Sequence, residues 1–415
     1  MGFSDNDKKV IRELSKKIME IASLPVQEKK REMWRKLNGL EDVRPMVWID
    51  EIPWGEFENS EEELHLRCTD KFARDVETEM RRLIYMWNHF RTDAVVDPFW
   101  YSPYAYNDSG FGLEIQSKKA DSEIGFGSAQ YLPLINNEAD IEKIKMPVIT
   151  PDWEKTERDY EMMCELTDGA IPLVKCGIRT MWVAPWDLLV MWLGVDQFFM
   201  MLIDHPEFLH KAISRLMDAF LSKLDQLEKH GLLSVSNGNH RVGSGGPGIT
   251  DELPQKDYDG KHARPIDQWG MSTGQIFSEI SPEMHDEFCL QYEMRWLERF
   301  GLNYYGCCEP LHNKIDILRK VPRLRRISMS PWADIAKGAE QIGRDYVISH
   351  KPNPAILAWD EWNPEQARNE LRKALEKAKG CNVEIVMKDI STCRNDPRRI
   401  SDWCKIAVET AEEFA

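Results

Sequence analysis

The alternation of short apolar runs with amphipathic helical stretches constrains the fold of this chain most strongly. Eight runs rich in apolar and β-branched residues are separated by helical segments; they cover residues 44–50, 94–99, 171–178, 232–237, 303–308, 325–330, 345–350 and 383–388. Eight buried strands alternating with helices predict an α/β fold, a single (β/α)8 barrel of the TIM type. A doubly wound sheet is the alternative, although no GxGxxG or GxxxxGK[ST] motif follows any of the runs.

Two helical segments precede the first of these runs. Residues 7–24 place Val10, Leu14 and Ile18 on one stripe, and a second helix continues after Pro25. We therefore expect an N-terminal helical extension over residues 1–40, followed by the barrel over residues 41–415. Further along the chain, Ser281 and Asn363 each precede a proline and a glutamate, which predicts a capped helix start at both positions.

Composition narrows the class of function. The 415 residues include 54 basic and 70 acidic side chains, a net charge of −16, which argues against nucleic-acid binding because phosphates are contacted mainly by clustered Lys and Arg. The start of the chain lacks an apolar stretch of signal-peptide length, and no apolar run reaches the length of a membrane span. We expect a cytoplasmic protein that binds small molecules or other proteins, and a homodimer is compatible with this expectation.

The stretch YYGCCEPLHN, residues 304–313, gathers several groups that can bind a metal. A disulfide is disfavoured because vicinal cysteines pair only through a strained ring, and nine cysteines over a long chain do not form a disulfide scaffold. A metal site, a nucleophilic thiol and two small buried residues at the end of a strand remain as explanations. His312 falls in the first turn of the following helix, where it caps the helix or faces solvent.

Reactive side chains of a parallel barrel collect at the carboxyl ends of its strands. Those ends supply candidate catalytic groups at Glu309, His240, Asp50 and Arg179, and candidate metal ligands at Cys308, Cys393, Glu309 and Cys307. Zinc takes thiolate, imidazole and carboxylate ligands, and a closed barrel would bring Cys308 and Cys393 toward each other. The competing explanation for each cysteine is burial as a small apolar residue. That explanation suffices for Cys289 and for the other cysteines in helices, and His285 is expected to be an ordinary helix residue.

Fifteen tryptophans raise the prospect of a large apolar pocket. Several lie near strand ends or in the loops that follow them, where they could form the walls of a pocket for a planar ligand or cap the barrel core. The candidate substrate-binding residues are Trp48, Trp54, Trp100, Trp182, Asn237, Trp269, His350 and Lys351.

The order of segments resembles the uroporphyrinogen decarboxylase superfamily. The stretch beginning CGIRTMWVAPWDLLVMWLG and running through DHPE, and the stretch ISPEMHDEFCLQYEMRWLERFG, are similar to two segments of that superfamily. The resemblance covers roughly residues 40 to 412 and implies a single (β/α)8 barrel. The decarboxylases carry an arginine-rich loop after the first strand, whereas this chain has RPMVWIDEIPWG there, an acidic sequence that is unsuited to a polycarboxylate porphyrinogen.

The other branch of the superfamily, the cobalamin-dependent methyltransferases, is the closer match. GCCEPLHNKIDIL stands where those enzymes carry an H-x-C zinc motif, and DISTCRNDPRRISDW resembles their second cysteine segment, with Cys393 at the cysteine. If Cys308 is the first cysteine, Gly306 stands in place of the histidine, so that the third ligand would come from Glu309, Cys307 or His240.

The resemblance implies a zinc-dependent methyltransferase that moves a methyl group between a corrinoid (cobalamin) on a separate protein and a small molecule, such as a thiol, a tetrahydrofolate or a methyl ether. Two alternatives remain. The chain could be a decarboxylase or lyase acting on a non-porphyrin acid, or a non-catalytic barrel that binds a tetrapyrrole or corrinoid.

Overall fold

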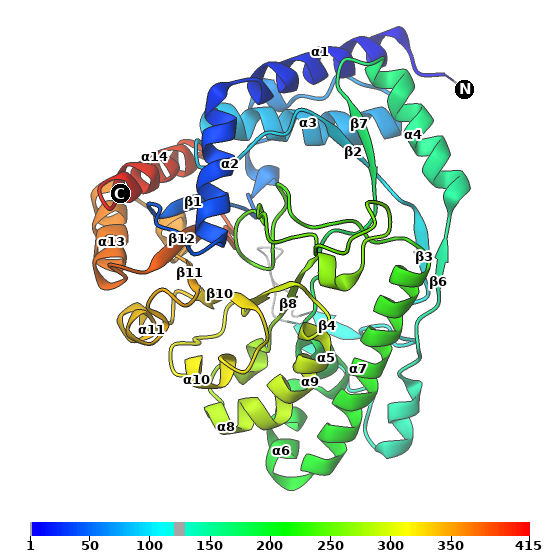
Figure 1. The fold of residues 1–415 in the computed structure, drawn as a ribbon, viewed down its shortest axis with the longest axis vertical. Helices are drawn as coiled ribbons and strands as arrows, with labels where there is room; N and C mark the ends of the chain where they lie inside the picture. The colour runs from blue at the N-terminus through cyan, green and yellow to red at the C-terminus, as the bar shows by residue number, and fades with distance from the viewer. Residues whose placement is uncertain (1, 120–128) are drawn as a thin grey trace.

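The core of the protein is a six-stranded parallel sheet. The computed structural model describes residues 2–119 and 129–415, and the strands run in the order β1-β12-β11-β10-β9-β8 (Figure 1). Every neighbouring pair in this sheet is parallel, as βαβ connections require. The strands are β1 (Met46–Ile49), β8 (Trp269–Ser272), β9 (Leu302–Tyr305), β10 (Leu324–Met329), β11 (Val347–His350) and β12 (Asn382–Met387).

A second parallel pair, β2 (Trp100–Pro103) and β7 (Leu173–Cys176), extends the wall around the core. Just after β7, Ile178 forms a parallel bridge with Leu233, and the Trp269 amide of β8 donates to Ser236 Oγ at 2.6 Å. At the other edge of the six-stranded sheet, the Asp93 amide donates to the carbonyl of Val47 in β1 at 3.0 Å. These links are consistent with the expected TIM-type barrel.

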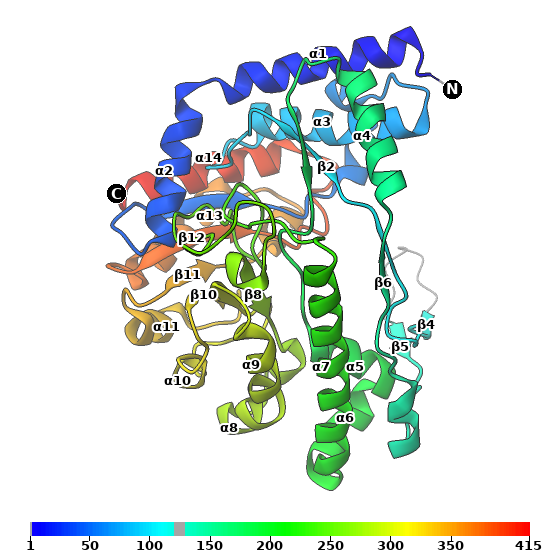
Figure 2. The ribbon, with the colours of Figure 1, turned by 45° about the vertical axis from the view of Figure 1, so that its right-hand side comes forward.

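Helices cover the outside of the strands, and α1 lies across the end of the molecule (Figures 1 and 2). The α-helices are α1 (Asp5–Ala22), α2 (Pro25–Asn38), α3 (Lys71–His89), α4 (Trp153–Thr167), α5 (Pro185–Leu193), α6 (Val195–Asp204), α7 (Pro206–Lys229), α8 (Pro282–His285), α9 (Gln291–Leu297), α10 (Ile315–Leu318), α11 (Ile335–Ile342), α12 (Ala355–Ala358), α13 (Pro364–Lys377) and α14 (Arg398–Glu412). Two short antiparallel pairs lie outside the core: β3 (Tyr106–Asp108) with β6 (Ile149–Pro151), and β4 (Ser117–Lys119) with β5 (Ala129–Tyr131).

The predicted strands are confirmed most closely in the C-terminal half. The runs at 303–308, 325–330, 345–350 and 383–388 correspond to β9, β10, β11 and β12, and the helical extension appears as α1 and α2. The prediction for 94–99 is wrong: this segment has no strand pairing, and β2 begins at Trp100. Residues 232–237 form only the single bridge at Leu233. Strand β8 was not predicted, because Trp269–Ser272 contains a glycine and no β-branched residue.

The predicted caps are confirmed by hydrogen bonds. Ser281 Oγ accepts from the Met284 amide at 3.3 Å, and Asn363 Oδ1 accepts from the Gln366 amide at 3.0 Å. The helix that follows Ser281 was expected to run unbroken to residue 301. Instead, a π-helical turn over Asp286–Leu290 separates α8 from α9.

In the described part of the chain, no single helix has the length and apolar character needed to cross a membrane. Helices α5 and α6 meet the length and composition test only as a pair, and they meet at a bend of 99°.

A glycine-rich loop, residues 241–248, packs against one face of the six-stranded sheet. A Cβ atom on Gly245 would lie 2.5 Å from Glu384 Oε1, and one on Gly246 would lie 2.5 Å from the Trp34 ring. A residue larger than glycine would therefore clash at both positions. Ser244 Oγ lies 2.9 Å from Tyr304 Oη of β9, so the loop is joined to the sheet by hydrogen bonds as well as by close packing.

A fully buried ion pair joins this loop to the strands. Arg326 Nη1 of β10 donates to Glu384 Oε2 of β12 at 3.1 Å, and both side chains have 0% exposure. The Gly246 amide donates to the same carboxylate at 3.1 Å, while Arg326 also donates to the Gly246 carbonyl and to Asn38 Oδ1 at the end of α2. Burying a charge costs less free energy when the charge is paired and hydrogen-bonded in this way.

The ion pair generates a prediction of stability. Glu384→Gln leaves the Arg326 guanidinium buried without a counter-charge, and we expect the free energy of unfolding to fall by roughly 3–5 kcal/mol. Urea denaturation followed by circular dichroism measures this loss. Glu413→Gln, which removes the partner of Arg372 in a partly exposed pair, is the matched control and should change stability by about 1 kcal/mol or less. Equal effects of the two substitutions would contradict the role of the buried pair.

Candidate active site at the carboxyl ends of the strands

The turn after β9 carries the two vicinal cysteines. Gly306 has φ 96°, and a Cβ atom there would lie 2.4 Å from Leu311 Cδ1. A histidine at this position would strain the backbone and displace the Leu311 side chain. The turn places Cys307 in the interior and leaves Cys308 half-buried.

Glu309 holds this turn in place. Its carboxylate is fully buried and accepts hydrogen bonds from Thr273 Oγ1 at 2.7 Å, from the Gly274 amide at 3.3 Å and from the Cys307 amide at 2.8 Å. Both oxygens are thus engaged by donors from the turns after β8 and β9. The geometry makes Glu309 a positioning residue for the thiol pair.

The two thiols form a pair with an ammonium group beside it. Cys307 Sγ lies 3.5 Å from Cys308 Sγ, and Lys388 Nζ lies 3.9 Å from Cys308 Sγ. The hydrogen bond from Cys308 lowers the pKa of Cys307 against the opposing effect of burial, and Lys388 and Lys351 lower it further. The same hydrogen bond raises the pKa of Cys308, so Cys307 is the more acidic thiol of the pair.

Lys388 itself belongs to a network of charges at the ends of β1 and β12. Burial opposes its charge, but Cys307, Asp389 and Glu51 together raise its pKa above the ordinary value. Glu51 Oε2 accepts from the Asp389 amide at 2.9 Å, and Glu51 and Asp389 have φ 53° and 55°. Two strained non-glycine residues at neighbouring strand ends are typical of functional sites.

Arg241, from the glycine-rich loop, completes the network. Its Nη1 lies 2.8 Å from Asp50 Oδ2 and 2.9 Å from Glu51 Oε1. Burial would raise the pKa of Glu51, but its bonds to Asp389 and Arg241 and the charge of Lys388 lower that pKa to about 2. Asp50, a predicted catalytic residue, forms an ion pair with Arg241. Arg241 is a further member of the site, which the sequence analysis does not predict.

Cys393 lies in a different environment. Its thiol donates to Glu56 Oε2 at 3.2 Å, and its amide donates to the same oxygen at 2.8 Å. Burial and the Glu56 carboxylate raise the pKa of Cys393 to about 12. The sequence offered no sign of this contact, because Glu56 lies 337 residues away in an acidic loop.

His240 is buried, and neither of its ring nitrogens has a hydrogen-bond partner among residues 2–119 and 129–415. Burial and the charges of Arg179 and Arg326 lower its pKa to about 3, so the imidazole is neutral. Asn237 is held differently: its Nδ2 donates to the Leu253 carbonyl at 3.1 Å.

Lys351, at the end of β11, reaches into the buried network beside the glycine-rich loop. Its Nζ donates to Tyr304 Oη at 2.9 Å and to Ser349 Oγ at 2.5 Å, and Ser349 Oγ donates to Glu384 at 2.5 Å. The neighbouring His350 has a pKa lowered to about 4 by burial and by Lys351.

A cavity of about 790 Å³ opens beside β2, between α3 and α4. Arg179 lies over the Tyr101 ring, 3.8 Å from its centroid, and both residues line the cavity together with Asn239. Its walls combine aromatic rings, among them Trp100, with several carboxylates. Asn239 is two residues from Arg241, so one loop connects the cavity to the charges around the thiol pair.

The other predicted tryptophans are placed apart from this cavity. Trp48 lies against Trp34, with ring centroids 6.4 Å apart, and Trp54 packs among Phe57, Tyr85 and Phe90. Trp269 is buried and donates to the Gly248 carbonyl at 2.9 Å, whereas Trp182 is 49% exposed. Of the predicted tryptophans, Trp100 lines this cavity.

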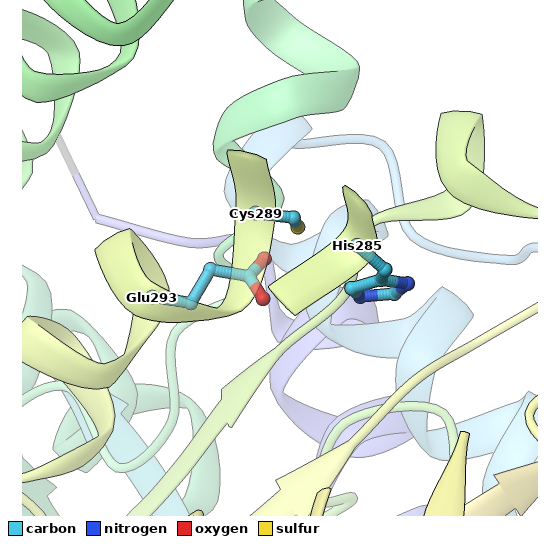
Figure 3. Close-up of side chains that lie close together, drawn as sticks. All are labelled: His285, Cys289 and Glu293. Atoms are coloured by element: carbon cyan, nitrogen blue, oxygen red, sulfur yellow. The ribbon is translucent and has the colours of Figure 1, made fainter. Parts of the chain in front are cut away.

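The predicted zinc ligands are not gathered into one set. Cys307 and Cys308 lie together, but Cys393 is bonded to Glu56, both oxygens of Glu309 are engaged, and the Lys388 ammonium stands beside Cys308. Among the described residues, three candidate metal ligands come together within 4.8 Å of one another at His285, Cys289 and Glu293 (Figure 3). The donors of the thiol turn therefore do not fit a zinc ion as they are placed.

Comparison with known proteins bears on the fold. No protein-family model matches the chain, and no curated protein matches it in sequence; membership of the uroporphyrinogen decarboxylase superfamily thus has no support from sequence comparison. Among solved structures, a methyltransferase from Methanosarcina mazei is similar with a TM-score of 0.51 and 13% sequence identity, over 93% of this chain and 98% of that chain. At this identity the likeness shows a shared fold.

The thiol pair yields a prediction of pH dependence. Cys308→Ala and Lys388→Met each remove a group that lowers the pKa of Cys307, so the pH midpoint for alkylation of Cys307 by iodoacetamide should move upward in both variants, further in Cys308→Ala. Mass spectrometry of the peptide that contains residue 307 measures the rate at each pH. Lys373→Met, an exposed lysine in α13, is the control and should leave the midpoint in place. An unchanged midpoint in Lys388→Met would exclude electrostatic activation by that residue.

Proposed function

We propose that this chain is a methyltransferase that works at the carboxyl ends of its strands. In this proposal a methyl group moves between a corrinoid carried by a separate protein and a small molecule, such as a thiol, a tetrahydrofolate or a methyl ether. Support comes from the fold that the chain shares with a methyltransferase and from the sequence resemblance. The observation that carries the proposal is the Cys307–Cys308 thiol pair facing Lys388.

Methyl transfer is a displacement at carbon, in which one heteroatom or metal gives up the methyl group as another nucleophile takes it. Negative charge changes on the heteroatom of the small molecule during this step. Lys388, with its raised pKa, keeps its charge across the physiological range and would stabilise an anionic heteroatom beside Cys308. Arg241, Asp50 and Glu51 would hold the lysine and the adjoining loop in position.

The cavity beside β2 is the proposed place for the small molecule. A volume of about 790 Å³ is within the range of ligand pockets. Its aromatic walls suit a methylated planar or cationic group, and Arg179 stacked on Tyr101 offers a fixed donor for an oxygen of the ligand. Asn239, which lines the cavity, lies two residues before Arg241, the first residue of the glycine-rich loop.

The corrinoid, when a partner protein brings it, supplies a metal that gives or takes the methyl group. Zinc has no role at the thiol turn in this proposal, because Cys393 is bonded to Glu56 and Glu309 accepts hydrogen bonds from Thr273 and Cys307. The residues of this chain would bind and orient the small molecule, exclude water through the buried turn, and hold a positive charge at Lys388 Nζ.

An assay of methyl transfer tests the proposal. We expect the purified protein to remove the methyl group from methylcobalamin in the presence of a thiol or tetrahydrofolate, or to methylate reduced cobalamin from a methoxy-substituted aromatic acid. The change in the cobalamin absorption spectrum measures both directions. Lys388→Met should lower the rate by about 100-fold, the magnitude typical for loss of one electrostatic contact at a reacting centre.

The matched control is Cys164→Ser, which alters an exposed cysteine in α4 and should retain the wild-type rate, whereas Cys307→Ser should not. Absence of methyl transfer with every one of these substrates would contradict the proposal. Release of carbon dioxide from a carboxylic acid would favour the lyase alternative instead.

A further inference from the structure

Three side chains that can bind a metal lie on consecutive turns of one helical segment, which packs behind β8 and β9. His285 ends α8, Cys289 lies in the π turn and Glu293 lies in α9, so the three are spaced four residues apart. Each has 0% exposure, and one ligand atom from each lies within 4.8 Å of the other two. Figure 3 shows the carboxylate of Glu293 and the sulfur of Cys289 on the side of the segment that also carries His285.

The π turn accounts for this alignment. In an α-helix of 3.6 residues per turn, side chains spaced by four drift by about 40° at each step. The wider turn over Asp286–Leu290 reduces that drift and keeps three successive side chains on one face. Single π turns inside α-helices are frequently found at functional sites.

The residues around the cluster supply a fourth possible ligand, an oxygen atom. Tyr305 Oη lies 2.8 Å from His285 Nε2 and donates to Glu293 Oε2 at 2.7 Å. Ser272 Oγ donates to the other oxygen of Glu293 at 2.7 Å. His285 Nδ1 is buried and has no hydrogen-bond partner within the described part of the chain, so these residues leave one nitrogen of the imidazole unsatisfied.

The charge balance of the region favours a cation. Glu293 and Glu309 are both fully buried, and the Lys314 ammonium, which interacts with Glu309, is also bonded to the Phe277 carbonyl at 2.5 Å. Burying a charged carboxylate is costly in a medium of low dielectric constant, and a metal cation bound to Glu293 would offset that cost.

We propose that His285, Cys289 and Glu293 bind a zinc ion, with the Tyr305 oxygen as the fourth ligand. A set of one nitrogen, one sulfur and two oxygen donors suits zinc, which accepts imidazole, thiolate and carboxylate in a tetrahedral site. All four groups are buried, as in a structural zinc site that has no open position. Binding replaces the Cys289 thiol proton with the metal, so one proton is released.

The site lies directly behind the thiol turn. Tyr305 is two residues before Cys307, and a Cβ atom on Gly274 would lie 2.5 Å from Cys289 Sγ, while the Gly274 amide bonds to Glu309. Zinc at this site would stabilise the turns after β8 and β9, which position the thiol pair. This role is separate from methyl transfer and does not depend on it.

Metal analysis tests the proposal. Inductively coupled plasma mass spectrometry of the purified full chain should find about one zinc per chain, and Cys289→Ala and Glu293→Gln should lose it. Replacement of zinc by Co²⁺ in the wild-type chain should give a near-ultraviolet charge-transfer band from thiolate to cobalt together with intense visible bands of a tetrahedral site. The cobalt spectrum requires no variant to fold.

Controls separate this site from the thiol turn. The Cys307→Ser/Cys308→Ser double variant and Cys404→Ser, a buried cysteine in α14, should each keep the zinc and the cobalt band. Loss of zinc from the double variant with retention in Cys289→Ala would overturn the proposal and place the metal at the thiol turn. A wild-type chain that holds no zinc and gives no thiolate-to-cobalt band would overturn it as well. Neither result depends on whether methyl transfer is observed.

Discussion

The buried ion pair between Arg326 and Glu384 is the interaction on which the arrangement of the strand ends depends. Both charges are removed from water, so each must find several partners, and those partners come from β10, β12, the glycine-rich loop and Asn38 of α2. A pair of this kind does not by itself guarantee high stability, since desolvation opposes the attraction. It does fix the position of the glycine-rich loop, because the Gly246 amide and carbonyl bond to the two charged side chains.

The candidate site follows from that constraint. The loop that bonds to Glu384 through Gly246 also carries Arg241, which pairs with Asp50 and Glu51 at the end of β1. Glu51 in turn accepts from Asp389, beside Lys388 and the thiol pair. A continuous chain of hydrogen bonds and ion pairs therefore connects the interior of the sheet to the thiols, and the strained backbone at Glu51 and Asp389 is held by the same chain of contacts.

Local chemistry made part of this structure predictable. Ser281 and Asn363 cap helices through contacts within three residues, and β9 to β12 are runs whose β-branched and apolar side chains leave little choice of structure. Strand β8 escaped prediction because it is only four residues long and contains a glycine and no β-branched residue. Glu309 lies at the carboxyl end of β9, as its position in the sequence indicates, but the hydrogen bonds that its buried carboxylate accepts from Thr273 and Gly274 cannot be inferred from sequence spacing. The sequence predicts only ordinary helix residues at Cys289 and His285, because a spacing of four is also the spacing of a packed helix face. The π turn that aligns them cannot be recognised from residue type.

The most direct test of this account is hydrogen exchange in the glycine-rich loop, followed by mass spectrometry on the native protein. The amides of Val242, Gly245, Gly246 and Gly248 are all bonded, three within the loop and its neighbour His240 and one to Glu384. If the buried ion pair holds the loop, the peptide covering residues 241–248 should exchange as slowly as β10, and far more slowly than the exposed loop at residues 256–262. Exchange of residues 241–248 at the rate of that exposed loop would contradict the account.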